Sequence, residues 1–195
     1  MQIAIKNFEK NIKKARHLAD IYRGLKANTT AAIDLSDILR MELVLAVSAL
    51  DHYIHEIVRL GILEAYRGRR RRTKSFLKFS VSLETLINSD RDLTTLDWLE
   101  AEIRLQFGHK SFQRAEKIAE AIRFISEVNL WNKLATQLGS TPENIKLRLN
   151  SIVERRNKIV HEADTSFIHE EWVEEAVNFI ILIANKIHEI VTTNY

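Results

Sequence analysis

The chain has 195 residues, of which 46% are hydrophobic and 28% are charged. This balance is typical of a globular domain with one core, and it excludes an intrinsically disordered chain. The net charge of +3 is too small to identify a class of partner, and the absence of cysteine excludes disulfides, thiolate nucleophiles and cysteine-based zinc sites.

Apolar residues recur at helical spacing along most of the chain, and only five glycines and one proline interrupt them. The sequence therefore predicts an all-α fold, an antiparallel helical bundle. The first helix is expected within residues 1–30. A long second helix should begin near Asp34 or Ser36 and run to about Tyr66, where Gly68 would stop it.

The middle of the chain predicts shorter elements. The basic stretch 67–75 is expected to be a solvated loop, and a short helix should follow from about residue 82 to 88. Thr94 or Thr95 would cap the next helix, which should stop before Gly108.

Three helices are predicted in the last third of the chain. One should run from residue 112 to 138. Thr141 and Pro142 mark the start of the next, because threonine caps helix N-termini and proline suits the first helical position. The last helix is expected from about residue 166 to 192.

The sequence contains no internal repeat and no linker-like composition, so we place residues 1–195 in a single domain. The N-terminus lacks an apolar signal core, and the longest unbroken apolar run, from Phe179 to Ala184, is too short to span a membrane. We therefore expect a cytoplasmic protein with no membrane partner.

Arg156 interrupts the apolar stripe of the penultimate predicted helix. It lies one turn after Ile152 and one turn before Val160, so its guanidinium faces inward and needs an acceptor or an opening to water. Asn157 and His161 are four residues apart and share a helix face. On an ideal helix, His161 lies about 140° around the axis from Arg156. The two could meet one ligand through long side chains, a distorted helix end, or a second copy of the motif.

The segment 154–162 (ERRNKIVHE) resembles the R-x4-6-H motif of HEPN domains, in its common R-N-x-x-x-H form. In that superfamily the motif lies near the end of the penultimate core helix and one more helix follows, as predicted here. The stretch 43–59 resembles the first core helix, and the overall pattern is most similar to the RiboL-PSP branch. The resemblance covers about residues 34–192, a HEPN-like four-helix core with additional helices, and leaves 1–30 as an accessory helix.

The resemblance implies a metal-independent endoribonuclease that needs no cofactor and acts on RNA as a homodimer, with two motifs facing each other across a two-fold axis. His161 would be the general acid or base at the 2′-hydroxyl or the leaving 5′-oxygen. Arg156 would hold the scissile phosphate, and Asn157 would orient His161 or the phosphate. The products would carry 2′,3′-cyclic phosphate and 5′-hydroxyl ends.

The same resemblance implies a toxin or antiphage defence effector, held in check by an antitoxin or a regulatory protein such as a minimal nucleotidyltransferase. The alternative is a non-catalytic HEPN module that binds RNA, a nucleotide or a protein. A basic DNA-binding protein is a weaker alternative, because no helix-turn-helix spacing is evident. In the plainest interpretation, His161 only complements the dipole at the end of its helix.

Asp51 lies four residues after Val47 and three before Ile54, on an inward stripe. A buried carboxylate needs a cation, so Asp51 is a candidate to accept from Arg156 or a neighbour; alternatively it lies solvated at the edge of the stripe. Pairs such as Asp51 and His55 have helical ligand spacing, but no second cluster accompanies them, and no metal site is predicted.

A run of basic residues between positions 67 and 78 contains no acid and could follow RNA phosphates, or could simply be solvated. Its candidate RNA contacts are Arg69, Arg70, Arg71 and Arg72. On the last predicted helix, Phe179, Ile181 and Leu182 fall outside the main stripe, which leaves apolar surface for a dimer contact.

Overall fold

The computed structural model describes residues 1–30, 33–88 and 95–193, and over these residues the protein is helical without a strand. The all-α prediction is confirmed. The helices are α1 (Gln2–Asn28), α2 (Ser36–Tyr66), α3 (Lys74–Leu77), α4 (Leu83–Asn88), α5 (Asp97–Phe107), α6 (Ala115–Ile122), α7 (Leu130–Leu138), α8 (Pro142–His161) and α9 (Glu170–Thr193).

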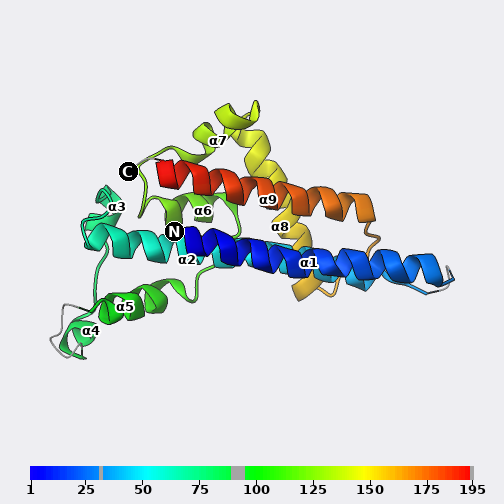
Figure 1. Cartoon of the computed structure of the whole chain (residues 1–195), viewed down its shortest axis with the longest axis horizontal. Helices are drawn as coiled ribbons and strands as arrows, with labels where there is room; N and C mark the ends of the chain where they lie inside the picture. Colours follow the sequence, from blue (N-terminus) through cyan, green and yellow to red (C-terminus); the bar gives the residue numbers. More distant parts are fainter. Residues whose placement is uncertain (31–32, 89–94, 194–195) are drawn as a thin grey trace.

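The long helix α2 is the centre of the fold (Figure 1). α1 packs along it in the opposite direction, and α9 contacts both of them. α5, α6 and α8 also pack on α2, so one helix touches most of the others. It can do so because apolar residues occupy several of its faces; the fully buried ones include Leu43, Val47, Leu50, Tyr53, Ile54, Ile57, Val58 and Ile62.

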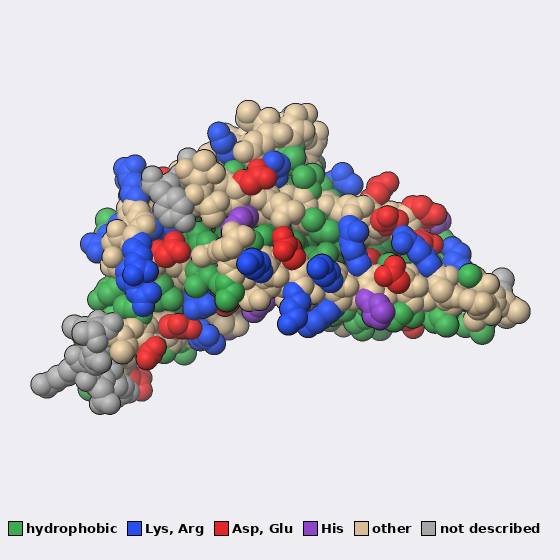
Figure 2. All heavy atoms as spheres, in the orientation of Figure 1, with side chains coloured by type: hydrophobic (Ala, Val, Ile, Leu, Met, Phe, Trp, Pro, Cys, Tyr) green, Lys and Arg blue, Asp and Glu red, His purple; other side chains and the backbone are tan. Residues whose placement is uncertain are grey.

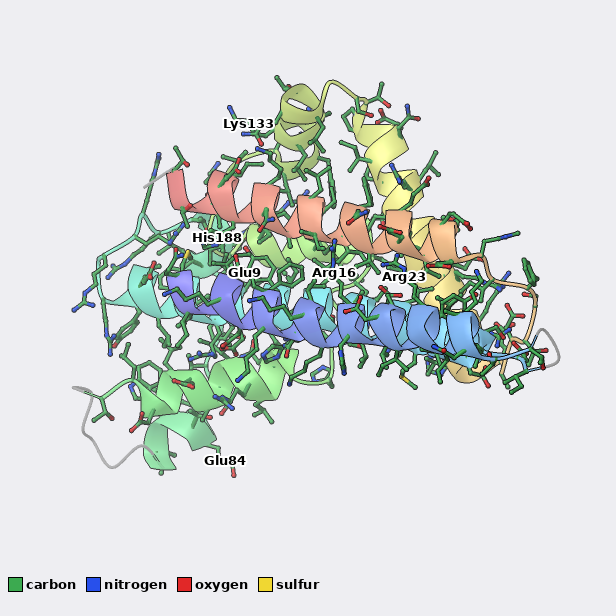
Figure 3. All side chains as sticks on the ribbon, turned by 45° about the vertical axis from the view of Figure 1, so that its right-hand side comes forward. Glu9, Arg16, Arg23, Glu84, Lys133 and His188 are labelled. Carbon is green, nitrogen blue, oxygen red and sulfur yellow. The ribbon has the colours of Figure 1, made fainter. Side chains whose placement is uncertain are left out.

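The first helix belongs to this core and is not an accessory. Its apolar positions recur at helical spacing and are buried against α2 and α9: Ala4, Ile5, Phe8, Ile12 and Ala15. The far end of α1 is joined to the start of α9 by charge. Arg23 Nε donates to Glu170 at 2.7 Å and Arg23 Nη2 to Glu174 at 2.9 Å, while Lys26 Nζ reaches Glu170 at 3.2 Å (Figure 3). Figure 2 shows acidic and basic side chains intermixed at this end of the molecule.

The helix predicted from residue 112 to 138 is wrong as a single element, because α6 and α7 are separate. The side chain of Asn129 accepts from Asn132 N at 3.3 Å and starts α7 as a new helix. Gly139, with φ of 60°, ends α7 in the left-handed region that favours glycine. After the break α7 packs on α9, whereas α6 packs on α2, and both helices contact α8.

The start of α8 follows the predicted cap: Thr141 Oγ1 accepts from Asn144 N at 3.2 Å, and Pro142 occupies the first turn. The start of α9 comes later than predicted, at Glu170. The preceding residues form no helix, and Arg40 Nη2 donates to the carbonyl oxygens of Thr165 at 2.9 Å and Ser166 at 3.2 Å.

One helix, α9, is long and apolar enough to cross a membrane by length and composition. Half of its most apolar window is buried inside the fold, and its inward residues belong to the common core. We therefore interpret α9 as a core helix.

Candidate active-site cleft

Helix α8 delivers the motif residues to the surface. Its inward stripe consists of Ile145, Leu149, Ile152 and Val153, all buried. Arg156 is the next position on this stripe and is half-buried, as the sequence pattern predicts. Its Nη1 donates to Asn157 Oδ1 at 3.1 Å, whereas its buried Nε has no hydrogen-bond partner among the described residues. A cation that is fixed in place and incompletely paired is suited to bind an anion.

The three motif residues open into one cleft of about 650 Å³. Arg156, Asn157 and His161 form one wall, and residues between Phe107 and Phe124 form the other. The separation expected of Arg and His on an ideal helix therefore does not keep them out of a shared site.

His161 is the last residue of α8 and is exposed. The chain turns immediately after it: Glu162 N and Asp164 N donate to Lys158 O at 3.0 and 3.3 Å, and Ala163 between them has φ of 49°. A non-glycine residue in the left-handed region is strained, so the neighbouring contacts must hold this turn closed.

Arg155 supplies such contacts. Its guanidinium is paired with Asp164, and its Nη2 donates to the carbonyl oxygens of Ser166 at 2.9 Å and Phe167 at 3.3 Å. Hydrogen bonds from Ser166, followed by the charge of Arg155, lower the pKa of Asp164. Arg155 therefore points away from the cleft and fixes the chain that leaves His161.

The facing wall carries cations that we did not single out in the sequence. Lys110, Arg114 and Lys117 all line the cleft. Lys117 Nζ is paired with Glu120 at 2.9 Å, and Lys110 Nζ lies 5.0 Å from the centre of the Phe107 ring. In the sequence these three cations are spaced four and then three residues apart. This spacing alone does not indicate a binding site, because only the fold brings the segment close to α8.

Asp51 is not hydrogen-bonded to Arg156, which was one of the partners that we expected for it. Its Oδ1 accepts from Phe112 N at 2.6 Å, and its side chain is partly exposed. The neighbouring His55 Nε2 lies 3.1 Å from Lys110 O. Asp51 thus faces inward, as the pattern predicts, but its partner is the backbone of the facing wall.

The solvated-loop prediction for the basic stretch is wrong at Arg70, whose side chain is 0% exposed. It donates to Ile125 O and Val191 O, both at 2.9 Å, and so joins the break after α6 to the end of α9. Arg72 donates to the last carbonyl oxygens of α2 at 3.3 Å. Arg69, Arg71 and Arg72 are exposed, and they remain the accessible candidates of this segment for RNA contact.

A further expectation concerns the apolar surface of α9. Phe179 is 7% exposed and lies under the guanidinium of Arg148, 4.5 Å from its ring centre, so it is not spare dimer surface. Leu182 is 39% exposed and still available. Within the described ranges, no three His, Asp or Glu side chains converge as metal ligands.

Comparison with protein families matches residues 6–193 to the family described as RiboL-PSP-HEPN. The match includes the motif, the facing wall and nearly all of α1, and so extends beyond the 34–192 range suggested by the sequence. Searches of curated proteins and of solved structures gave no match. Because the family match spans nearly the whole sequence, the chain belongs to the RiboL-PSP-HEPN family.

Proposed function

We propose that the protein is a metal-independent endoribonuclease, and that the cleft at the end of α8 is its active site. The observation that carries this proposal is the convergence of Arg156, Asn157 and His161 on one cleft, with a buried Arg156 Nε that has no partner among the described residues. A half-buried guanidinium beside an imidazole supplies the two groups that RNA cleavage needs, a phosphate ligand and a proton carrier.

In the proposed reaction, His161 accepts the proton of the 2′-hydroxyl, and the 2′-oxygen attacks the adjacent phosphorus. The bond from phosphorus to the 5′-oxygen breaks, and the leaving oxygen takes up a proton. The products are a 2′,3′-cyclic phosphate and a 5′-hydroxyl. Arg156 stabilises the charge on the phosphoryl oxygens, and Asn157, bonded to Arg156, fixes its direction.

This scheme requires a general base and a general acid, and each chain offers one motif histidine. A homodimer with two motifs facing one another would supply both, which is why we propose that the protein acts as a dimer. The exposed Leu182 on α9 gives part of the apolar surface such a contact needs.

The test is RNA cleavage in EDTA by wild type, His161→Ala and Arg156→Ala, with His17→Ala as a control that removes an exposed imidazole from α1. We expect cleavage without added metal, a loss of about 10²–10⁴-fold in His161→Ala, and wild-type rates in the control. A phosphatase that removes only phosphate monoesters should leave the 3′ ends of the products unchanged, because a 2′,3′-cyclic phosphate is a diester. No cleavage by a folded, dimeric wild type would contradict the proposal.

The second candidate is a non-catalytic module that binds RNA, a nucleotide or a protein. The volume of the cleft, about 650 Å³, supports this candidate, because sites that bind small molecules usually have volumes of roughly 300–1,000 Å³. RNA or nucleotide binding that persists without cleavage would support this candidate.

We also propose a cytoplasmic role as a toxin or defence effector restrained by an antitoxin or a minimal nucleotidyltransferase. Growth arrest on expression of wild type, absent with His161→Ala, would support this role.

A further inference from the structure

The cleft wall opposite the motif has the properties of an anion-binding surface. Lys110 and Arg114 lie on this wall, across the cleft from Arg156. Neither is paired with an acid among the described residues. Glu120, the one acid on the described lining, is occupied by Lys117 at 2.9 Å. Two cations that have no acidic partner in the described part of the chain therefore line the same cleft as Arg156.

The backbone that carries these cations is fixed by side chains from three other helices. From α2, Asp51 accepts from Phe112 N at 2.6 Å, and His55 contacts Lys110 O at 3.1 Å. The His55 and Phe112 rings also pack together, with centres 4.5 Å apart.

The end of the segment is held as firmly at Ala115. Its N–H donates to Asn150 Oδ1 of α8 at 2.9 Å, and its carbonyl accepts from Trp131 Nε1 of α7 at 3.1 Å. Residues 110–115 form no helix until Ala115, yet side chains hold both of their ends. A connection that is fixed in this way holds the backbone of Lys110 and Arg114 in place before any ligand arrives, which lowers the entropic cost of binding.

We infer that Lys110 and Arg114 form a second phosphate subsite, for the RNA phosphodiester that flanks the one held by Arg156. The inference rests on the proposed RNA substrate. The half-buried ring of Phe124 contributes apolar surface to the same cleft, and an aromatic surface accommodates a base without selecting its identity. One wall thus holds the reacting phosphate, and the other holds its neighbour and the intervening base.

The test measures binding and does not depend on cleavage. In the His161→Ala background, the affinity for a short fluorescent single-stranded RNA is measured by anisotropy over a series of salt concentrations. Lys110→Gln/Arg114→Gln should weaken binding on the order of tenfold and reduce the salt slope by about 1.4, since each lost phosphate contact on a single strand contributes about 0.7.

Two further variants remove the same charge elsewhere. Lys10→Gln/Lys14→Gln changes exposed lysines on α1 and is the matched control, which should keep nearly wild-type affinity and slope. Arg69→Gln/Arg71→Gln changes two exposed arginines beyond α2 and tests the rival candidate surface; we expect it to lose less affinity than the cleft variant. Lys110→Arg/Arg114→Lys should restore binding. Thermal melting confirms that each variant is folded.

The inference is overturned if the cleft variant binds like the α1 control, if the Arg69/Arg71 variant carries the loss, or if the His161→Ala parent binds no RNA. Failure of the proposed ribonuclease is a separate result: wild type would cut nothing in EDTA, while binding would still depend on Lys110 and Arg114.

Discussion

Arg155, the residue before the motif arginine, is paired with Asp164, three residues beyond His161. The pair spans the motif from outside and closes the strained turn at Ala163, whose φ is 49°. The adjacent arginines of α8 thus have different tasks: one faces the cleft and the other fixes the chain beyond the histidine.

We expect Arg155→Gln to lower the cleavage rate constant about tenfold with little change in KM, because His161 loses its fixed position while the phosphate ligand remains. Single-turnover kinetics and amide exchange of residues 162–168 measure the two effects. Lys146→Gln, at the other end of α8, is the control and should change neither quantity. Unchanged kinetics together with faster exchange would show that the turn is uncoupled from catalysis.

Asp51→Ala is expected to weaken RNA binding and to destabilise the fold by about 1.5–3 kcal/mol, because Phe112 N loses a charged acceptor. Asp51→Asn keeps an acceptor oxygen and should lie close to wild type in both measurements. Chemical denaturation and anisotropy provide the readouts. Equal stability of wild type and Asp51→Ala would mean that water replaces the carboxylate at no cost.

Glu42 gives a pH dependence of stability. Burial on α2 raises its pKa from 4.5 to about 7, against the lowering effect of Arg23 and Arg16. The folded state therefore retains a proton that the unfolded state releases, so stability falls as pH rises from about 4.5 to 7 and stays reduced above that range.

Glu42→Gln removes this titration. The variant and wild type should be equally sensitive to denaturant near pH 4, and the variant should gain about 1–3 kcal/mol in relative stability by pH 8. Urea denaturation at several pH values measures the difference. A difference that is constant with pH would contradict the assigned pKa.

Arg70→Met should destabilise the protein by roughly 3 kcal/mol, because the buried carbonyl oxygens of Ile125 and Val191 lose their donor. The neighbouring Arg69→Met is the matched control, since Arg69 is exposed and should cost less than about 0.5 kcal/mol. Both free energies of unfolding come from denaturant titrations. Similar values for the two variants would show that Arg70 is not a structural tie.

The sequence predicted those features of the fold that depend on interactions between residues close together in the chain. The start of α8 was predictable because Thr141 and Pro142 act within one turn, and the inward position of Arg156 follows from helical spacing. The division between α6 and α7 was missed because its apolar spacing continues through the break. Asn129, a helix-starting residue, was the signal against one continuous helix.

The sequence predicted which way a side chain faces better than it predicted which group the side chain contacts. Helical spacing placed Asp51 on an inward face but could not say that Phe112 N, rather than Arg156, lies opposite it. Arg70 looked solvated because its neighbours in the chain are basic, and only the return of α9 buries it. Lys110 and Arg114 gained their significance in the same way, from a helix that follows them in sequence.

The buried Nε of Arg156, which has no hydrogen-bond partner in the part of the chain that the structure describes, implies a conflict between thermal stability and activity. A buried donor without an acceptor destabilises the fold, and a methionine of similar length would relieve it. Selection of variants for heat resistance alone would then favour loss of this arginine and yield robust but inactive protein. Any directed evolution of this chain toward higher melting temperature needs a cleavage screen beside it.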